Sequence, residues 1–309
     1  MFQRRIVRGR LLAPDRERWD GLHIFVRSAW RTDSARISST GEFSVPLSDV
    51  TTDSADLLVR RANAKAPAYH TARIGVRMPN ASVLTAIVLI PTQWTIRIGT
   101  HAGTTIRISP RAVTARGLDR SRFARFHRAN ENSPWKSVGW RAADFPLALA
   151  FARDSAGPQI SPADSAALWR AVRLLEADLG AIYFRPAMLY EVIERDARVM
   201  VRIEPELHAN GVTSVAWGPL SNLHGVELAF RSVRHLHDAG ISMHELLHTL
   251  GFGHTSSWYS LMRASERRAA RATPEDVAYV QMLLRLRQLE ATSGVLHGLM
   301  AATAGVTEP

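Results

Sequence analysis

The hydrophobic pattern of the first 110 residues differs from that of the rest of the chain. Short runs rich in Val, Ile, Thr and Ser alternate there with turn residues, and no long helical period occurs. Runs of this length and composition predict β-strands, and several of them at this spacing favour a small β-sandwich. The runs cover residues 21–26, 42–47, 56–60 and 95–108.

From about residue 147 the pattern becomes that of an α/β unit. An apolar run at 147–151 predicts a strand, and Ser161-Pro162 then opens a helix, because serine is a good cap and proline favours the first helical position. Gly180 ends this helix, and further strands are predicted at 199–203 and 226–230. The apolar face of the helix consists of Leu168, Val172, Leu175 and Leu179.

Length sets the expected number of domains. A chain of 309 residues is too long for one core of ordinary size, so two domains are expected. We predict a β-sandwich at residues 1–110 and an α+β domain, a twisted sheet packed with helices, at residues 142–290. An Arg-rich linker at 111–141 joins them, and residues 291–309 form a tail.

The longest apolar run, residues 83–90, is too short to span a membrane. Two interpretations are open: a buried strand, or the hydrophobic segment of a signal peptide in a product that starts at Met78. The arginines near the N-terminus are followed by no such segment. The chain therefore shows no clear signal peptide, and we expect no stable membrane insertion.

The sequence HELLHTLGFGH, residues 244–254, contains the candidate metal-binding and catalytic residues. In an α-helix, residues four apart lie on nearly the same face, so His244 and His248 can direct their imidazoles to one metal ion. Gly251 follows where the helix must stop, since glycine accepts the left-handed conformation that reverses the chain. The reversal returns His254 to the same metal. Three protein ligands leave one position open, which is typical of catalytic rather than structural zinc.

Glu245 follows the first histidine and projects beside the metal rather than onto it. There it can take a proton from a zinc-bound water and pass it to the leaving amine, as general base and acid. The motif therefore predicts one catalytic Zn²⁺ ion and a hydrolytic reaction. The shorter pattern HExxH would also fit a helix whose histidines are only polar surface.

The extended pattern HExxHxxGxxH resembles the signature of the metzincin zinc peptidases. That family carries a methionine-containing turn beneath the metal, and Met262 follows the third histidine at a spacing similar to that of the matrixin branch. The sequence Thr273-Pro274-Glu275-Asp276 then opens another capped helix, and matrixin-like domains end on such a helix. The resemblance implies a metzincin-type catalytic domain with an active-site helix and a Met-turn.

The resemblance also implies roles for individual residues. Glu245 would be the catalytic base of a zinc metalloendopeptidase, and Met262 would form the structural turn under the metal. Trp258 and Tyr259 would line the substrate pocket just past the cleaved bond. The metal ligands would be His244, His248 and His254.

Some family features are missing. Arg263 and Ala264 follow the turn methionine where the family often has tyrosine or proline, so no transition-state tyrosine is carried over. The chain has no cysteine for a latency switch and no match to the family's structural zinc and calcium loops, so calcium is not indicated. We interpret His235 and His237 as solvated residues of a loop, and Asp238 as a helix N-cap.

Two further resemblances concern the substrate and the N-terminal domain. In the family, a sheet-edge strand near the active-site helix binds the extended substrate chain, and the strand at 226–230 is either that edge or an ordinary interior strand. The sequence SSTGEFSVPL, residues 38–47, resembles the turn and strand of carboxypeptidase regulatory-like domains. Such modules serve as structural or interaction domains, so we assign no chemistry to this one.

The net charge of +11 makes the protein basic, as nucleic-acid binding requires. Of the 39 basic residues only Lys65 and Lys136 are lysines, and the arginines are spread along the chain rather than gathered in one run. No nucleic-acid motif accompanies them. We therefore expect no nucleic-acid partner and attribute the arginine bias to a GC-rich genome.

Two functions remain open. The first is a secreted or extracytoplasmic zinc endopeptidase that hydrolyses peptide bonds of extended protein or peptide substrates through a Glu-activated zinc-bound water. The second is a zinc-bearing binding or adhesion protein with a silent peptidase domain. The intact Glu245 disfavours the second, because a domain without catalysis could lose its base and keep its fold. The sequence predicts neither the physiological substrate nor the oligomeric state.

Overall fold

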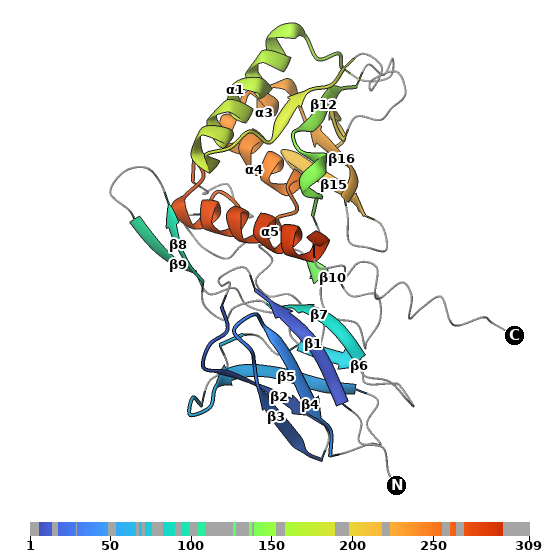
Figure 1. Cartoon of the computed structure of the whole chain (residues 1–309). Helices are drawn as coiled ribbons and strands as arrows, with labels where there is room; N and C mark the ends of the chain where they lie inside the picture. Colours follow the sequence, from blue (N-terminus) through green and yellow to red (C-terminus); the bar gives the residue numbers. More distant parts are fainter. Residues whose placement is uncertain are drawn as a thin grey trace, which may run out of the picture.

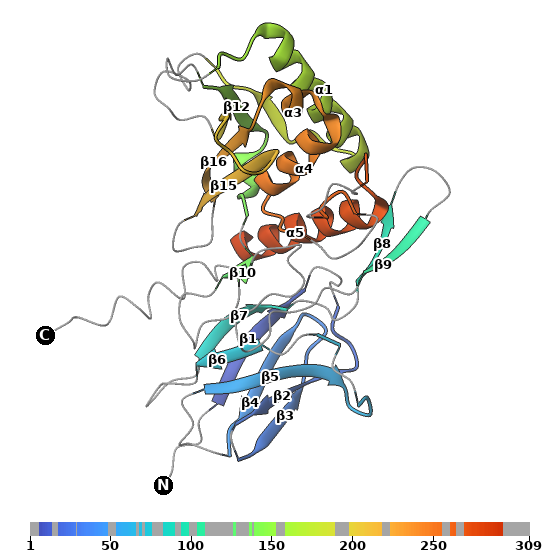
Figure 2. The same ribbon diagram turned by 180° about the vertical axis from the view of Figure 1, so that it is seen from behind.

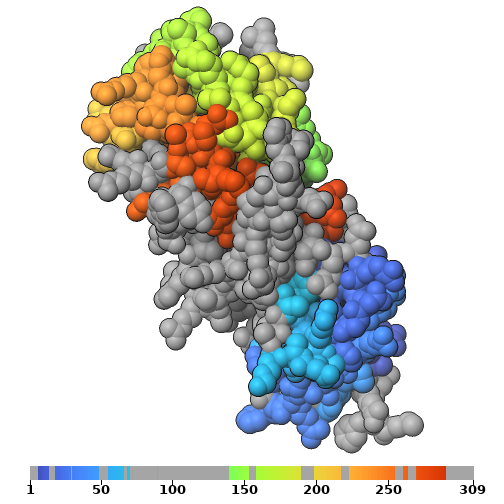
Figure 3. Space-filling model, turned by 90° about the vertical axis from the view of Figure 1, so that its left-hand side faces the viewer, coloured from blue at the N-terminus to red at the C-terminus, as the bar shows by residue number. Residues whose placement is uncertain are grey.

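The computed structural model of the chain places two groups of elements at opposite ends of an elongated molecule (Figure 1). Viewed from a third side, the residues coloured blue and cyan gather at one end and those coloured green to red at the other (Figure 3). Both helices and sheets are present, so the chain is α+β. The structure describes residues 6–13, 18–28, 30–48, 54–65, 68–69, 72–75, 83–89, 94–98, 104–108, 126–127, 136–137, 139–152, 158–188, 198–217, 223–254, 260–263 and 269–292.

The first group consists of two sheets that share a core. Alternation of buried and exposed positions, as along β4, directs one face of a strand inward. The inward faces meet in one hydrophobic cluster that includes Leu11, Ile24, Val45 and Leu57. The sheets have the strand orders β4-β1-β7 and β3-β2-β5-β6, formed by β1 (Ile6–Leu12), β2 (Leu22–Arg27), β3 (Thr32–Arg36), β4 (Glu42–Pro46), β5 (Ser54–Arg61), β6 (Ala72–Gly75) and β7 (Val83–Val88).

The apolar run at residues 83–90 contains strand β7, which pairs in parallel with β1. The run at 95–108 is not one strand but a hairpin of β8 (Trp94–Ile98) and β9 (Thr104–Ile108), which lies beside helix α5 (Pro274–Thr292) in both ribbon views (Figures 1 and 2). Strands β10 (Phe126–His127) and β11 (Lys136–Ser137) form a second short hairpin.

The second group is built on a five-stranded sheet with the order β13-β12-β14-β16-β15. The first four of these strands run in parallel, and β15 joins β16 antiparallel. The predicted strands at 147–151 and 199–203 are confirmed as β12 and β14. The strands are β12 (Leu147–Phe151), β13 (Phe184–Pro186), β14 (Val199–Ile203), β15 (Gly211–Trp217) and β16 (Leu223–Phe230).

The strand predicted at 226–230 belongs to β16 and lies in the interior of the sheet, so the interior alternative is confirmed and the edge alternative is excluded. The edge next to β16 is β15 (Gly211–Trp217), which the sequence pattern did not single out. A strand's place in a sheet depends on pairing between distant segments, and here β14 pairs with β16 while the intervening β15 is left on the outside.

Helices α1 (Pro162–Leu179), α3 (Val233–His237) and α4 (Ala239–Thr249) cover one face of this sheet (Figure 2). The opposite face carries polar contacts, such as the ion pairs of Arg202 with Glu204 and Glu227. The chain also makes a 3-10 turn, η1 (Ala142–Asp144), before β12. Within the described ranges, no helix is long and apolar enough to cross a membrane.

The helix boundaries follow the predicted signals. Ser161 caps α1 through reciprocal hydrogen bonds with Asp164, and Gly180 ends it in the left-handed conformation with φ 75°. Asp238 is the N-cap of α4, as predicted, because its side chain accepts the N–H of Ile241. The short helix α3 was not predicted, and it places His235 and His237 on a helical turn rather than in a loop.

Candidate metal centre

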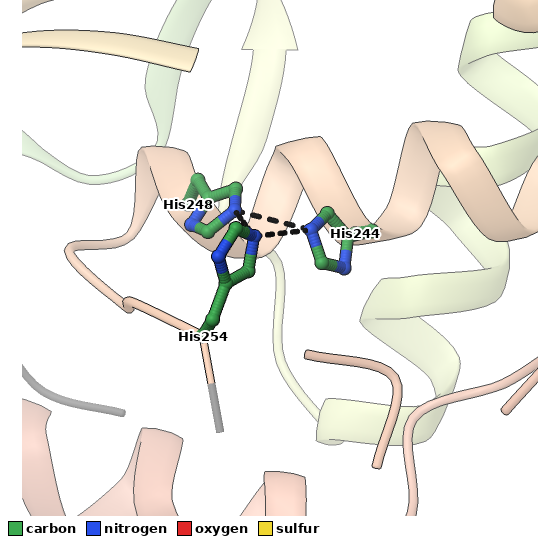
Figure 4. Close-up of side chains that lie close together, drawn as sticks. All are labelled: His244, His248 and His254. Atoms are coloured by element: carbon green, nitrogen blue, oxygen red, sulfur yellow. Dashed lines mark hydrogen bonds between the residues drawn. The ribbon is translucent and has the colours of Figure 1, made fainter. Parts of the chain in front are cut away.

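Helix α4 and the turn after it bring three imidazoles together. His244 and His248 lie one helical turn apart, and Gly251 reverses the chain with φ 103°, so that His254 returns toward α4. The Nε2 atom of His244 lies 3.1 Å from that of His248 and 3.1 Å from that of His254, and the third separation is 3.2 Å. Figure 4 shows the three rings pointing toward one another.

Backbone carbonyls fix the tautomers of the first two histidines. Nδ1 of His244 lies 2.7 Å from the carbonyl oxygen of Leu261, and Nδ1 of His248 lies 2.7 Å from that of Phe252. Because a carbonyl oxygen can only accept, each Nδ1 must carry the proton and donate it. In the neutral form of each ring, Nε2 then carries the lone pair, and the two Nε2 atoms face each other across 3.1 Å.

This arrangement fits a metal ion. Facing lone pairs repel in a site where His244 and His248 are 2% and 6% exposed, and a cation between them removes the repulsion. A tetrahedral zinc with Zn–N bonds of about 2.0–2.1 Å would separate its ligand nitrogens by about 3.3–3.4 Å, close to the spacing seen here. Within the described part of the chain, this trio is the one cluster of His, Asp or Glu that could hold a metal.

Glu245 is buried beside the histidines, with 4% of its surface exposed. Its Oε2 accepts a hydrogen bond of 2.6 Å from the hydroxyl of Thr213 on the edge strand β15. A Cβ atom on Gly211 of the same strand would lie 2.9 Å from both Cγ and Oε1 of Glu245. The absence of a side chain at residue 211 thus makes room for the carboxylate, and Thr213 holds its orientation.

The end of α4 is anchored by Trp140. This side chain is 1% exposed, and its Nε1 donates a 2.6 Å hydrogen bond to the carbonyl of Thr249, the residue after His248. The carbonyls of a last helical turn have no partner within the helix, so an indole N–H satisfies one of them here. Trp140 therefore fixes the helix end at the point where the chain turns toward His254.

Asp276 connects helix α5 to the turn that contacts His244. It is fully buried, and Oδ2 accepts the N–H groups of Leu261 (3.0 Å) and Thr273 (2.8 Å), while Oδ1 accepts the Ser260 hydroxyl. Ser260 Oγ in turn accepts the N–H of Met262 at 3.0 Å. Asp276 thereby holds the backbone of Leu261, whose carbonyl group contacts Nδ1 of His244, as outer contacts do in metal sites.

The predicted site residues are only partly placed. The three histidines and Glu245 come together, and Met262 is fully buried in the adjoining turn at residues 260–263. The predicted pocket residues Trp258 and Tyr259 lie outside the described residues.

Sequence reasoning missed four residues that support the site. Asp276 could be recognised from the sequence as an acid in the first turn of a capped helix, but its contacts with Ser260 and Leu261 could not. The sequence around the other three residues gives no sign of their roles. The four residues are Trp140, Gly211, Thr213 and Asp276.

Comparisons with known proteins add little. No protein-family model and no curated protein matches the sequence. One similar solved structure is the GH20 exo-β-N-acetylglucosaminidase from Vibrio harveyi in complex with N-acetylglucosamine, with 8% sequence identity and a TM-score of 0.23. The match covers 79% of this chain and 36% of that one, so this chain spans about a third of its length. A likeness this weak carries no argument about fold or activity.

We predict that Asp276→Asn weakens metal binding. The amide of asparagine has only one oxygen, so it cannot accept both from the Leu261 and Thr273 N–H groups and from the Ser260 hydroxyl, and the turn that orients His244 is disturbed. The affinity for Zn²⁺, measured by competition with a chromophoric chelator, should fall about 10–100-fold. Glu275→Gln removes the same charge from the same turn of α5 and should keep wild-type affinity. Wild-type affinity in a folded Asp276→Asn protein would refute this role.

Proposed function

We propose that this protein is a zinc-dependent endopeptidase with a metzincin-type catalytic domain behind a small β-sandwich. The convergence of three Nε2 atoms next to a buried carboxylate carries the proposal. An all-imidazole ligand set suits zinc, and three protein ligands leave a coordination position for the reaction. We also propose that the enzyme acts outside the cytoplasm, as proteins with this pairing of domains usually do.

The residues of the site have separate tasks in this mechanism. A bound zinc ion would polarise the scissile carbonyl and lower the pKa of the attacking water. Glu245 takes the proton of that water and delivers it to the leaving amine, and the Thr213 hydroxyl keeps one carboxylate oxygen in place. The carbonyls of Leu261 and Phe252 hold His244 and His248 with Nε2 toward the metal.

Strand β15 offers a surface for an extended substrate. It forms one edge of the sheet, and alternate residues along it, Val212 and Ser214, are exposed while Gly211 and Thr213 face Glu245. A polypeptide can add to such an edge through main-chain hydrogen bonds, which explains binding with little dependence on side chains. In this proposal the bond to be cut lies beside Glu245, where β15 and α4 meet.

The direct test is hydrolysis of an unfolded protein such as casein. Wild type should cut it, a chelator should stop the reaction, and added Zn²⁺ should restore it. Glu245→Ala should retain zinc but lose about 10²–10⁴-fold in rate, because the general base is gone. If wild type binds one zinc ion and cuts no protein, the alternative of a zinc-bearing binding protein is favoured instead.

A pair of glycine variants tests the position of Glu245. Gly211→Ala places a methyl group against the Glu245 side chain, and displacement by about 1 Å should lower kcat/KM about 10²-fold with unchanged zinc content. Gly225→Ala, on the neighbouring strand β16, meets nothing within 4 Å and should behave as wild type. Equal activity of the two folded variants would contradict the role given to Gly211.

A further inference from the structure

A cavity of about 580 Å³ lies at the start of helix α4, outside the trio of histidines. This volume is within the range of small-molecule and side-chain binding pockets, about 300–1,000 Å³. Its walls come from α3, from the first turn of α4 and from the residue before β15. They are formed by Asn210, Arg234, His235, His237, Asp238 and Ile241.

Two of the residues that line the cavity lie next to residues of the candidate active site. Ile241 and Glu245 are four residues apart on α4 and so share a face of the helix, one turn or about 5.4 Å apart. Asn210 immediately precedes Gly211, which contacts the Glu245 side chain. A chain that lies along β15 and passes Glu245 therefore runs toward the cavity, which is one helical turn away.

The carboxylates near the cavity already have partners. Asp238 Oδ1 accepts the N–H of Ile241, and its charge faces the positive end of the α4 dipole. Asp164 accepts hydrogen bonds from the hydroxyl and the N–H of Ser161, and Nε2 of His237 lies 2.8 Å from its Oδ1. The Ser161 hydrogen bonds and the contact with His237 hold the pKa of the Asp164 carboxyl below its usual value, so it remains ionised.

The positively charged and hydrogen-bond-donating side chains that line the cavity have fewer partners than these carboxylates. Among the described residues, Arg234 takes part in no ion pair. His235 uses Nδ1 in a 2.9 Å hydrogen bond with Ser232, which leaves Nε2 for another group. A guanidinium group offers several N–H donors in a planar fork that matches a carboxylate. Ile241, 6% exposed, supplies an apolar wall for the methylene groups of a side chain.

We propose that this cavity is a substrate subsite that accepts an acidic side chain, Asp or Glu, with Arg234 as its main partner. The inference rests on the proposed endopeptidase function and adds a substrate preference to it. Arg234 acts on specificity and not on the chemical step, so its loss changes the choice among substrates. A lysine side chain at the same substrate position is rejected, because it places a second cation beside Arg234.

The experiment uses sets of peptides that differ only by Glu, Gln or Lys at one position on either side of the cleaved bond. At one position, wild type should cleave the Glu peptide about tenfold faster, by kcat/KM, than the Gln peptide, and the Lys peptide should be slowest. Arg234→Glu should reverse the order of the Glu and Lys peptides. Arg173→Glu, on the exposed side of α1, makes the same charge change away from the cavity and should keep the wild-type order.

Binding of the same peptides to zinc-loaded Glu245→Ala, followed by fluorescence anisotropy, separates recognition from turnover. Tighter binding of the Glu peptide that depends on Arg234 supports the subsite even if wild type turns out to cut nothing. Cleavage without an acidic preference overturns the subsite and leaves the endopeptidase function standing, and binding without an acidic preference overturns the subsite as well. A preference that survives Arg234→Glu in a folded protein also overturns it.

Discussion

The convergence of three imidazole rings at the end of helix α4 is the constraint on which this half of the molecule depends. Neutral rings whose Nδ1 atoms donate to carbonyls leave Nε2 atoms 3.1–3.2 Å apart, an arrangement that is unfavourable without a cation. The folded backbone imposes it, since the carbonyls of Leu261 and Phe252 hold two of the rings. The fold thus holds the three histidines in an arrangement that a metal ion fits.

Contacts from distant parts of the chain keep this arrangement in place. Asp238 caps the start of α4 and Trp140 bonds to its end, so the helix that carries two of the histidines is fixed at both termini. Asp276 ties α5 to the Leu261 peptide, and Thr213 on the sheet edge holds Glu245. The histidines and Glu245 share helix α4, but their side chains are oriented by contacts from different elements.

Local sequence signals predicted the parts of the site that lie close together in the chain. The spacing of His244 and His248, and the left-handed Gly251 that follows, define the helix and the turn without reference to the rest of the fold. The sequence left open whether residues 226–230 form the edge strand, because strand order is a long-range property and β15 carries no local mark of an edge. The role of Gly211 could not be predicted from the sequence either, because it depends on the packing of the Glu245 side chain against this residue.

X-ray absorption at the zinc edge of the zinc-loaded protein reports directly whether the three histidines bind the metal. We expect one zinc ion with three imidazole nitrogens and one oxygen at about 2.0–2.1 Å, and one imidazole fewer in His254→Ala. A zinc ion surrounded by five or six oxygen or nitrogen atoms, with a spectrum that His254→Ala leaves unchanged, would contradict this expectation. That result would mean that the three histidines do not form the metal centre.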